Sequence, residues 1–432
     1  MVNALLYWCC QMYASIEADA ILMAEPFKRE AENWLQLELN TPQSTTMVAA
    51  MFLSLGNLAQ GRDDAVMRHL SEAADTGVAL GLFGVPDAIA QATRNRLTES
   101  QAKALAYPSW GVFNWIVLMN LFYRQQNVTS LLYPPALNVS ALDGTSMSDA
   151  DDTEQLESDG PPSRHSDSGG TFVALCYFWR IMHGVMTVYN GRHEGVGQAP
   201  LTLEFAEYKF RELLAWTDEH LPLTMARSGD NPESVVILHL WLHSAVLDIF
   251  RPFLQGDAPQ KRRLRTFAPP MNTPDAAYAA SMEQLKRLII TYRSKYPAPP
   301  YSFIWQTTLL YTGNAMLCSE EEERFTHFLI CLYSCADMRQ SYRVTEAIVR
   351  ALLSMGMQNG VITGPVAQRI LTDFRSIAPR EVGAYDETLR PPLIAVLDHA
   401  VPAPDSTTVE LQSAQFESTM MLRDYTSLFD ID

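Results

Sequence analysis

The stretch Leu238-His-Leu-Trp-Leu-His-Ser-Ala-Val-Leu-Asp-Ile-Phe-Arg-Pro-Phe-Leu254 decides the fold of this chain. Nearly every position from Val235 to Phe250 is apolar, which predicts a helix that is buried on most of its sides. Asn231-Pro232-Glu233 predicts the start of this helix, with a capping side chain, a proline in the first turn and an acid near the positive end of the dipole. Pro252 disfavours helical geometry at Arg251, so we expect the helix to end there.

Outward from this helix, apolar residues recur at helical spacing and alternating β-branched patterns are rare. We therefore predict an all-α protein, an irregular multi-helix array in two lobes, with residues 1–142 as the first lobe and 171–402 as the second. The helices expected in the second lobe, besides the one above, are 171–190, 203–221, 276–292, 302–317, 325–338, 342–355, 367–374 and 392–400.

Two segments differ in composition from the rest. Residues 143–170 are rich in Ser, Asp, Gly, Glu and Pro and nearly free of apolar residues, which predicts a disordered acidic insertion. Asp151-Asp152 within it is interpreted as part of a solvated acidic run rather than as metal ligands. Residues 403–432 form a flexible acidic-hydrophobic tail. It is either an activation segment, whose apolar groups are buried by a partner, or a terminal helix docked on its own domain.

An apolar helix closed by Arg-Pro-Phe-Leu resembles part of the regulatory middle homology domain of fungal zinc-cluster transcription factors. Further motifs resemble that family in order and spacing: Pro26–Leu35, Thr46–Leu55, Gly61–Asp63, His69–Leu82, Trp110–Trp115 and Pro134-Pro135. Together these motifs cover most of residues 26–140 and 171–254. Each motif is short, and their order carries the assignment.

The resemblance implies a nuclear transcription regulator rather than an enzyme: a regulatory, ligand-sensing domain that controls a metabolic or secondary-metabolite gene set. The partners it implies are the transcription machinery or co-regulator proteins and a small-molecule effector, and a homodimer is one expectation because family members often act as dimers. Two alternatives stay open: a truncated gene model of a full zinc-cluster DNA-binding factor, and a helical small-molecule-binding protein or enzyme.

The zinc cluster of that family is absent from the sequence. Such a cluster needs paired Cys-x-x-Cys spacings, and no two cysteines of this chain have that spacing. The six cysteines are Cys9, Cys10, Cys176, Cys318, Cys331 and Cys335. Cys331 and Cys335 lie four residues apart, and we interpret them as core thiols rather than metal ligands. No zinc or other cofactor is therefore expected, and the scattered cysteines favour a reducing compartment.

The charge of the chain argues against direct DNA binding. The formal net charge is −17, whereas broad phosphate contact needs clustered lysine and arginine. DNA is then reached only indirectly or through a missing N-terminal module. Lys261-Arg-Arg-Leu-Arg265 is the one dense basic run, and it is either a nuclear localisation signal, a patch for an acidic partner or a solvated loop.

No catalytic or metal-ligating set stands out in the sequence. His239 and His243 lie one helical turn apart, a spacing that can bind zinc, but Leu240 replaces the glutamate of a metalloprotease motif and Asp248 faces another side of the helix. We interpret the histidines as a polar seam in a buried helix. Arg251 is expected to pair with a carboxylate or with carbonyl groups.

A pocket for an apolar effector is expected between the lobes, lined by some of the aromatic and methionine side chains. The tryptophans considered for it are Trp110, Trp115, Trp179, Trp216, Trp241 and Trp305. Glu320–Glu323 is interpreted as a surface turn or helix start. The apolar run Ala4–Cys10 lacks the basic lead of a signal peptide, and no uncharged apolar stretch reaches about 18 residues, so no membrane span is expected.

Overall fold

The computed structural model describes residues 1–123, 131–139, 167–190, 201–221, 232–254, 263–270, 272–296, 303–319 and 321–377. Within these ranges the chain forms fourteen α-helices and a short 3₁₀ helix, and no strand. The prediction of an all-α protein is confirmed.

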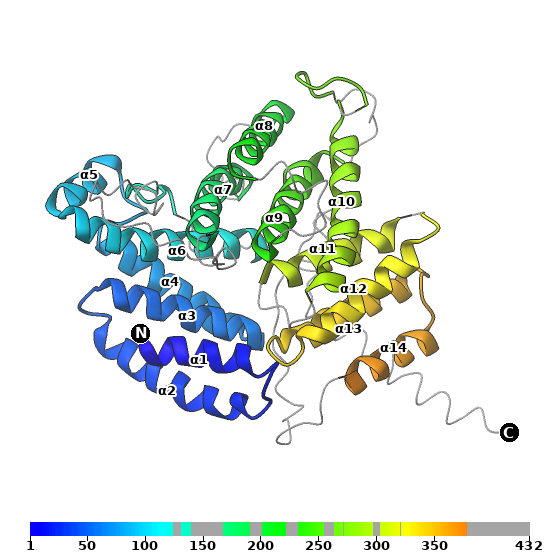
Figure 1. The fold of residues 1–432 in the computed structure, drawn as a ribbon, viewed down its shortest axis with the longest axis horizontal. Coiled ribbons are helices and arrows are strands. Elements are labelled where there is room, and N and C mark those ends of the chain that lie inside the picture. Colours follow the sequence, from blue (N-terminus) through cyan, green and yellow to red (C-terminus); the bar gives the residue numbers. More distant parts are fainter. Residues whose placement is uncertain are drawn as a thin grey trace, which may run out of the picture.

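The helices follow one another with short connections where the structure describes them (Figure 1). Their bounds are α1 Val2–Tyr13, α2 Ala20–Glu38, α3 Ser44–Gln60, α4 Asp63–Ala79, α5 Asp87–Arg96, α6 Glu99–Tyr123, α7 Asp167–Asn190, α8 Leu203–His220, α9 Glu233–Phe250, η4 Arg251–Phe253, α10 Pro274–Lys295, α11 Phe303–Cys318, α12 Arg324–Met338, α13 Val344–Gln358 and α14 Gly364–Ile377.

The N-terminal helices stack as neighbouring hairpins. Helix α1 packs on α2 and α3, and α3 packs on α4, as Figure 1 shows at the blue end of the chain. Gly61 ends α3 in the left-handed region at φ 71°, where a side chain would be strained, and its position before α4 matches the turn predicted there. Helix α6 then lies across α3 and α4 and carries the chain toward α7.

The core is continuous across the boundary between the two predicted lobes. Buried side chains of α3 and α6 belong to the same hydrophobic cluster as those of α9, α11 and α13. From Ser109 to Tyr123 all described positions of α6 except Gly111 are buried, and α9 is nearly as buried, because both sequences are apolar around the whole helix. These two helices form the centre of the molecule.

Helix α9 matches the predicted helix at its centre and differs at both ends. It begins at Glu233, so Pro232 precedes the first turn instead of lying in it, and Asn231 lies outside the described residues. Glu233 accepts a hydrogen bond from the Tyr292 hydroxyl at 2.6 Å. The α-helix ends at Phe250, and Pro252 lies within the 3₁₀ turn that follows, because that turn requires no amide hydrogen from proline.

Part of the predicted insertion is helical. Helix α7 begins at Asp167, so residues 167–170 of the predicted insertion are helical. Gly169 and Gly170 lie in the first turn of this helix, where glycine is tolerated. Residues 143–166, with Asp151-Asp152, lie outside the described part of the chain. The predicted helix 392–400 and the tail 403–432 lie outside it as well.

The first helix is joined to a segment far away in the sequence. The Ser341 hydroxyl, between α12 and α13, donates to the Met12 carbonyl near the end of α1 at 3.0 Å. The rings of Trp8 and Tyr342 meet edge to face with centroids 6.1 Å apart. The N-terminal hairpins and the C-terminal helices are therefore packed together rather than merely linked in order.

Two of the described helices are long and apolar enough to cross a membrane by length and composition. They are Gly170–Tyr189 and Glu233–Phe253, and 50% and 67% of their apolar windows are buried inside the protein. Each contains charged residues, as the sequence argument noted. Core helices of soluble proteins also meet these criteria of length and composition, and the burial of the two helices is typical of core helices.

Candidate functional site

A cavity lies where α6 meets α7, α9 and α11, between the two predicted lobes. The space open to the centre of a water molecule is about 20 Å³, which is room for about one water. It is lined by Leu118, Leu121, Phe122, Phe178, Trp179, Met182, Trp241, Ser244, Ala245, Asp248, Thr307 and Tyr311. The cavity thus combines an apolar wall with a few polar groups, as ligand sites do.

The apolar wall is aromatic. The rings of Trp179 and Trp241 meet edge to face with centroids 4.7 Å apart, and Phe178 lies 6.0 Å from Trp241. Two of the six tryptophans considered from the sequence therefore line the cavity. The other four are buried elsewhere in the core: Trp110, Trp115, Trp216 and Trp305.

The polar wall joins α9 to α11. The Tyr311 hydroxyl donates to one carboxylate oxygen of Asp248 at 3.3 Å, and the hydroxyls of Ser244 and Thr308 lie 3.5 Å apart. Asp248 is buried at the cavity edge. A buried carboxylate of this kind needs a partner, because a buried unpaired charge is costly.

Arg251 is that partner. Its guanidinium lies 3.4 Å from Asp248 and over the Tyr311 ring at 4.8 Å from the centroid. Burial by itself would lower the pKa of Arg251, but Asp248, Tyr278 and Tyr311 together outweigh burial and raise the pKa above its ordinary value. The prediction that Arg251 pairs with a carboxylate is confirmed. The arginine of the Arg-Pro-Phe motif therefore contacts two residues of the cavity wall, Asp248 and Tyr311.

His239 and His243 form the polar seam that the sequence predicted, on the side of α9 toward α10. Their ring centroids lie 6.2 Å apart, and Nδ1 of His243 is 3.4 Å from the Ser281 hydroxyl. Burial lowers the pKa of both rings, to about 4 for His243, so both are neutral near pH 7. Asp248 is engaged with Arg251 and Tyr311. Among the described residues no three His, Cys, Asp or Glu side chains are placed to hold a metal ion.

Five cysteines have described side chains, and all five are free thiols: Cys9, Cys10, Cys176, Cys331 and Cys335. Cys331 and Cys335 are buried in the core, as predicted, and burial raises the pKa of the Cys331 thiol to about 12. Cys176 is buried as well and accepts a contact from Asn114 at 3.6 Å. A protonated thiol in an apolar core is a packing group and a poor nucleophile.

The basic run is docked on α8 in the part that the structure describes. Leu264 is buried, and the Arg265 guanidinium lies 2.7 Å from Glu204. Lys261 and Arg262 lie outside the described residues. A nuclear import receptor that binds this basic run would therefore have to displace Glu204 of α8 from Arg265. Sequence reasoning missed this contact because Glu204 lies in another helix.

The acidic run ends at a helix start, as interpreted from the sequence. Glu323 directly precedes α12, and Glu321 forms an ion pair with the buried Lys286, which also contacts Glu283 at 2.5 Å. The Glu320 side chain is not among the described ones.

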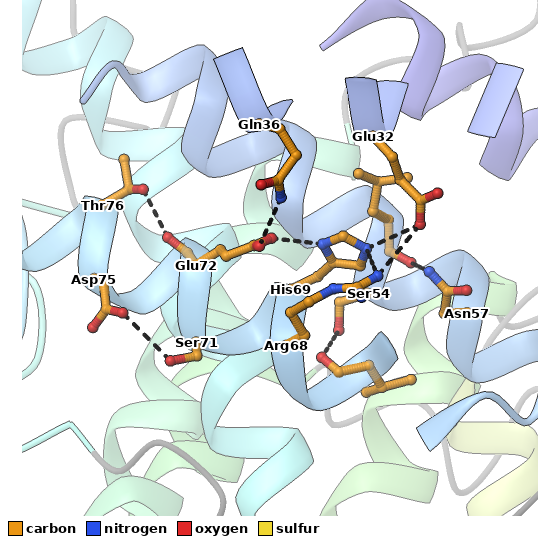
Figure 2. Close-up of polar contacts among 12 residues, drawn as sticks. Glu32, Gln36, Ser54, Asn57, Arg68, His69, Ser71, Glu72, Asp75 and Thr76 are labelled. Carbon is orange, nitrogen blue, oxygen red and sulfur yellow. Dashed lines mark hydrogen bonds and ion pairs between the residues drawn. The ribbon is translucent and has the colours of Figure 1, made fainter. Parts of the chain in front are cut away.

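A cluster that sequence reasoning missed lies between α2 and α4 (Figure 2). His69, only 1% exposed, has Nδ1 2.7 Å from Glu72 and Nε2 3.4 Å from Glu32. Arg68 lies 3.6 Å and Lys28 3.9 Å from the same Glu32 oxygen. The spacing of His69 and Glu72 on one helix was a visible signal, whereas the contact with Glu32 depends on how the two helices pack.

The two carboxylates of this cluster favour the charged form of the imidazole. Burial by itself would lower the pKa of His69, but its hydrogen bonds with Glu32 and Glu72 outweigh burial and raise the pKa above its ordinary value. The hydrogen bond with His69 lowers the pKa of Glu32. An imidazolium with a carboxylate on each ring nitrogen has no free nitrogen for acid–base chemistry, so the cluster joins two helices.

No protein family, curated protein or solved structure matches this chain. The resemblance to zinc-cluster transcription factors therefore rests on the motifs given above. Of the groups described, the cavity at the end of α9 is the one that combines a lined space with converging polar side chains, and we take it as the candidate site.

Proposed function

We propose that this chain is the regulatory domain of a fungal zinc-cluster-type transcription factor, and that a small molecule bound in the α6–α7–α9–α11 cavity controls it. We infer that its two lobes fall within residues 1–142 and 171–402, with the cavity where α6 of the first lobe meets α7, α9 and α11 of the second. It acts in the nucleus with the transcription machinery or co-regulator proteins, and it reaches DNA through a separate zinc-cluster module.

One observation carries this proposal. The arginine of the Arg-Pro-Phe motif, the feature that most resembles the family, is bound through Asp248 to Tyr311 in the wall of the cavity. A change in the cavity would alter the same contacts that fix the end of α9. Because α9 lies at the centre of the core, such a change can be transmitted to both lobes.

The size of the cavity indicates how a ligand would enter. Room for about one water means that an effector must displace side chains of the wall. Met182 is unbranched and adapts easily, and Trp241 is only partly buried. The effector is accordingly a small, mostly apolar molecule with a polar group for Asp248 or Ser244.

A reporter assay tests the regulatory function. The full chain fused to a foreign DNA-binding domain is expected to change reporter output relative to the DNA-binding domain alone. Ala245→Val, which adds two methyl groups at the cavity, is expected to shift that output, and Ala279→Val on the exposed side of α10 is its matched control. Equal output from the fusion, both variants and the DNA-binding domain alone would refute the proposal.

A thermal shift assay tests the ligand separately. A metabolite that binds only the folded protein raises the unfolding temperature, by an amount set by its concentration relative to its dissociation constant. We expect the shift to disappear in Ala245→Val and to persist in Ala279→Val. A shift that is equal in both variants would place the ligand outside this cavity.

A further inference from the structure

One carboxylate of α8, that of Glu207, accepts three hydrogen bonds from the loop of residues 263–270. Both oxygens of Glu207 accept hydrogen bonds from this loop, from the backbone N–H of Arg265 at 2.9 Å and that of Thr266 at 2.6 Å. The Thr266 hydroxyl donates to the same oxygen as its own N–H. All three donors therefore come from two consecutive residues.

Glu207 is ionised in this arrangement. Burial by itself would raise the pKa of the Glu207 carboxyl, but the hydrogen bonds from Thr266 and Arg265 outweigh burial and lower the pKa. Arg211, one turn further along α8, acts in the same direction. The loop is thus held by charge-assisted hydrogen bonds, which are stronger than neutral ones.

Apolar contacts flank the carboxylate on both sides. Leu264 is buried and its N–H donates to the Asn272 carbonyl at 2.8 Å, and the Phe267 ring lies 5.1 Å from Phe210 of α8. Between these anchors, Arg265 and Thr266 are exposed. The hydroxyl that completes the attachment is therefore on a side chain that an enzyme can reach after a local opening.

The sequence before Thr266 is basic. Arg263 lies three residues and Arg265 one residue before it, and both are exposed. Protein kinases with acidic substrate grooves select hydroxyls by this kind of charge pattern. In a chain of net charge −17, no other hydroxyl follows so dense a basic run.

Thr273 provides a contrast within the same region. Its hydroxyl accepts the Ala276 N–H at 3.2 Å as the cap of α10, and Pro270 stands three residues before it. The Thr273 hydroxyl thus has a structural partner, but no basic residue stands one or three residues before Thr273. A kinase that reads charge would distinguish the two threonines.

We propose that Thr266 is a phosphorylation site for a basophilic protein kinase, and that its phosphorylation releases the 263–270 loop from α8. The Thr266 oxygen attacks the γ-phosphorus of a nucleoside triphosphate, the bond from that phosphorus to the bridging oxygen breaks, and the nucleoside diphosphate leaves. The hydroxyl proton passes to the base of the kinase.

Electrostatics gives the direction of the effect. The modified oxygen can no longer donate to Glu207, and the phosphate adds nearly two negative charges beside that carboxylate and near Glu204. Arg265 and Arg211 are the cations that oppose this repulsion. Arg265 leaves with the loop, so it does not hold the phosphate against α8. Release also frees Arg265 from Glu204.

The site is tested on the folded full-length protein with a basophilic serine/threonine kinase and ATP, mapped by mass spectrometry. We expect phosphate at Thr266 and not at Thr273, and a rate about tenfold lower in Arg263→Gln. Thr266→Val should abolish the signal. Absence of phosphate at Thr266 in the folded protein would overturn the proposal, even if a peptide of the same sequence is a substrate.

The release is tested by hydrogen exchange of the 263–270 segment. The phosphorylated protein should exchange at least about tenfold faster there than the unmodified one, while exchange in α10 stays unchanged. Thr266→Val, which loses the hydroxyl but gains no charge, should give a smaller increase. Slower exchange after phosphorylation would mean that Arg211 and Arg265 bind the phosphate, and it would contradict release.

Discussion

The ion pair at the end of α9 and the histidine cluster between α2 and α4 are both buried, but they join different parts of the chain. Asp248 and Arg251 lie three residues apart, so their contact forms with α9 itself, and Tyr311 then attaches it to α11. His69 contacts Glu32 across two helices. The first group supports one helix end and a cavity wall, whereas the second holds two helices side by side.

Their charges also respond differently to pH. Arg251 keeps its charge throughout the neutral range because its pKa is raised above an already high value. The pKa of His69 is raised by its carboxylate partners from the ordinary histidine value, the one side-chain value that lies near neutrality. Stability measured as a function of pH can therefore separate the two groups.

The largest effect is expected at Asp248. Asp248→Ala leaves the Arg251 guanidinium buried without its carboxylate, and we expect the free energy of unfolding to fall by about 3 kcal/mol. Urea denaturation followed by circular dichroism measures it. Asp337→Ala is the matched control, because Asp337 is half exposed and 3.8 Å from Arg293, and it should cost less than about 1 kcal/mol. Equal losses in the two variants would contradict the buried pair.

The next effect concerns His69. His69→Gln removes the imidazolium between two carboxylates, and we expect a loss of about 2 kcal/mol at low pH. The raised folded pKa means that this stabilisation is fully present below the unfolded histidine pKa. It is lost as the pH rises through the folded pKa.

Denaturation of both proteins between about pH 6 and pH 9 tests the sign of this dependence. The difference between wild type and His69→Gln should shrink as the pH rises. Asp248→Ala should show no such trend over the same range. A constant difference for His69→Gln would contradict a folded pKa of His69 raised above the unfolded value within this range.

A smaller effect is expected at the cavity. Ala245→Val fills part of the space beside Asp248, and we expect stabilisation of about 0.5 to 1 kcal/mol. Ala279→Val on the exposed side of α10 should instead destabilise by a few tenths, about the helix-propensity difference. Thermal unfolding compares the two. Destabilisation by Ala245→Val of more than about 1 kcal/mol would indicate that the wall is already closely packed.

The smallest effect is expected at the rim of the histidine cluster. Arg68 is more than half exposed and lies 3.6 Å from Glu32, so Arg68→Gln should change stability by less than about 0.5 kcal/mol. High salt should reduce even this difference. A loss comparable to that of His69→Gln would show that the cluster acts as one charged network.

The sequence predicted the helices far better than the contacts between them. The helix expected at 203–221 is α8 at Leu203–His220, and that expected at 325–338 is α12 at Arg324–Met338. Apolar spacing carries this information because each helix must bury one face. The start of α7 was missed because the Ser, Asp, Gly, Glu and Pro content of residues 143–170 assigned all of them to a disordered segment, whereas the helix begins at Asp167.

The cavity and the polar clusters were predicted only in part. Arg251 was expected to find a carboxylate because a buried guanidinium needs one, and that need is visible in an apolar sequence. Its carboxylate partner is close in the sequence, because Asp248 lies three residues before Arg251. Glu32 with His69 and Glu207 with Thr266 are separated by 37 and 59 residues. Such pairs depend on the packing of whole helices, which spacing does not encode.

The bond from Ser341 to the Met12 carbonyl has a consequence for synthesis of the chain. Its two residues are 329 positions apart, so at roughly 5–20 residues per second the ribosome needs on the order of half a minute to make the second after the first. During that time the Trp8 ring of α1 has no contact with Tyr342, because Tyr342 has not yet been synthesised. Until Tyr342 is made, the part of α1 around Trp8 stays without this neighbour even after α2 and α3 have packed on α1, and a chaperone that recognises apolar helix surfaces can bind there.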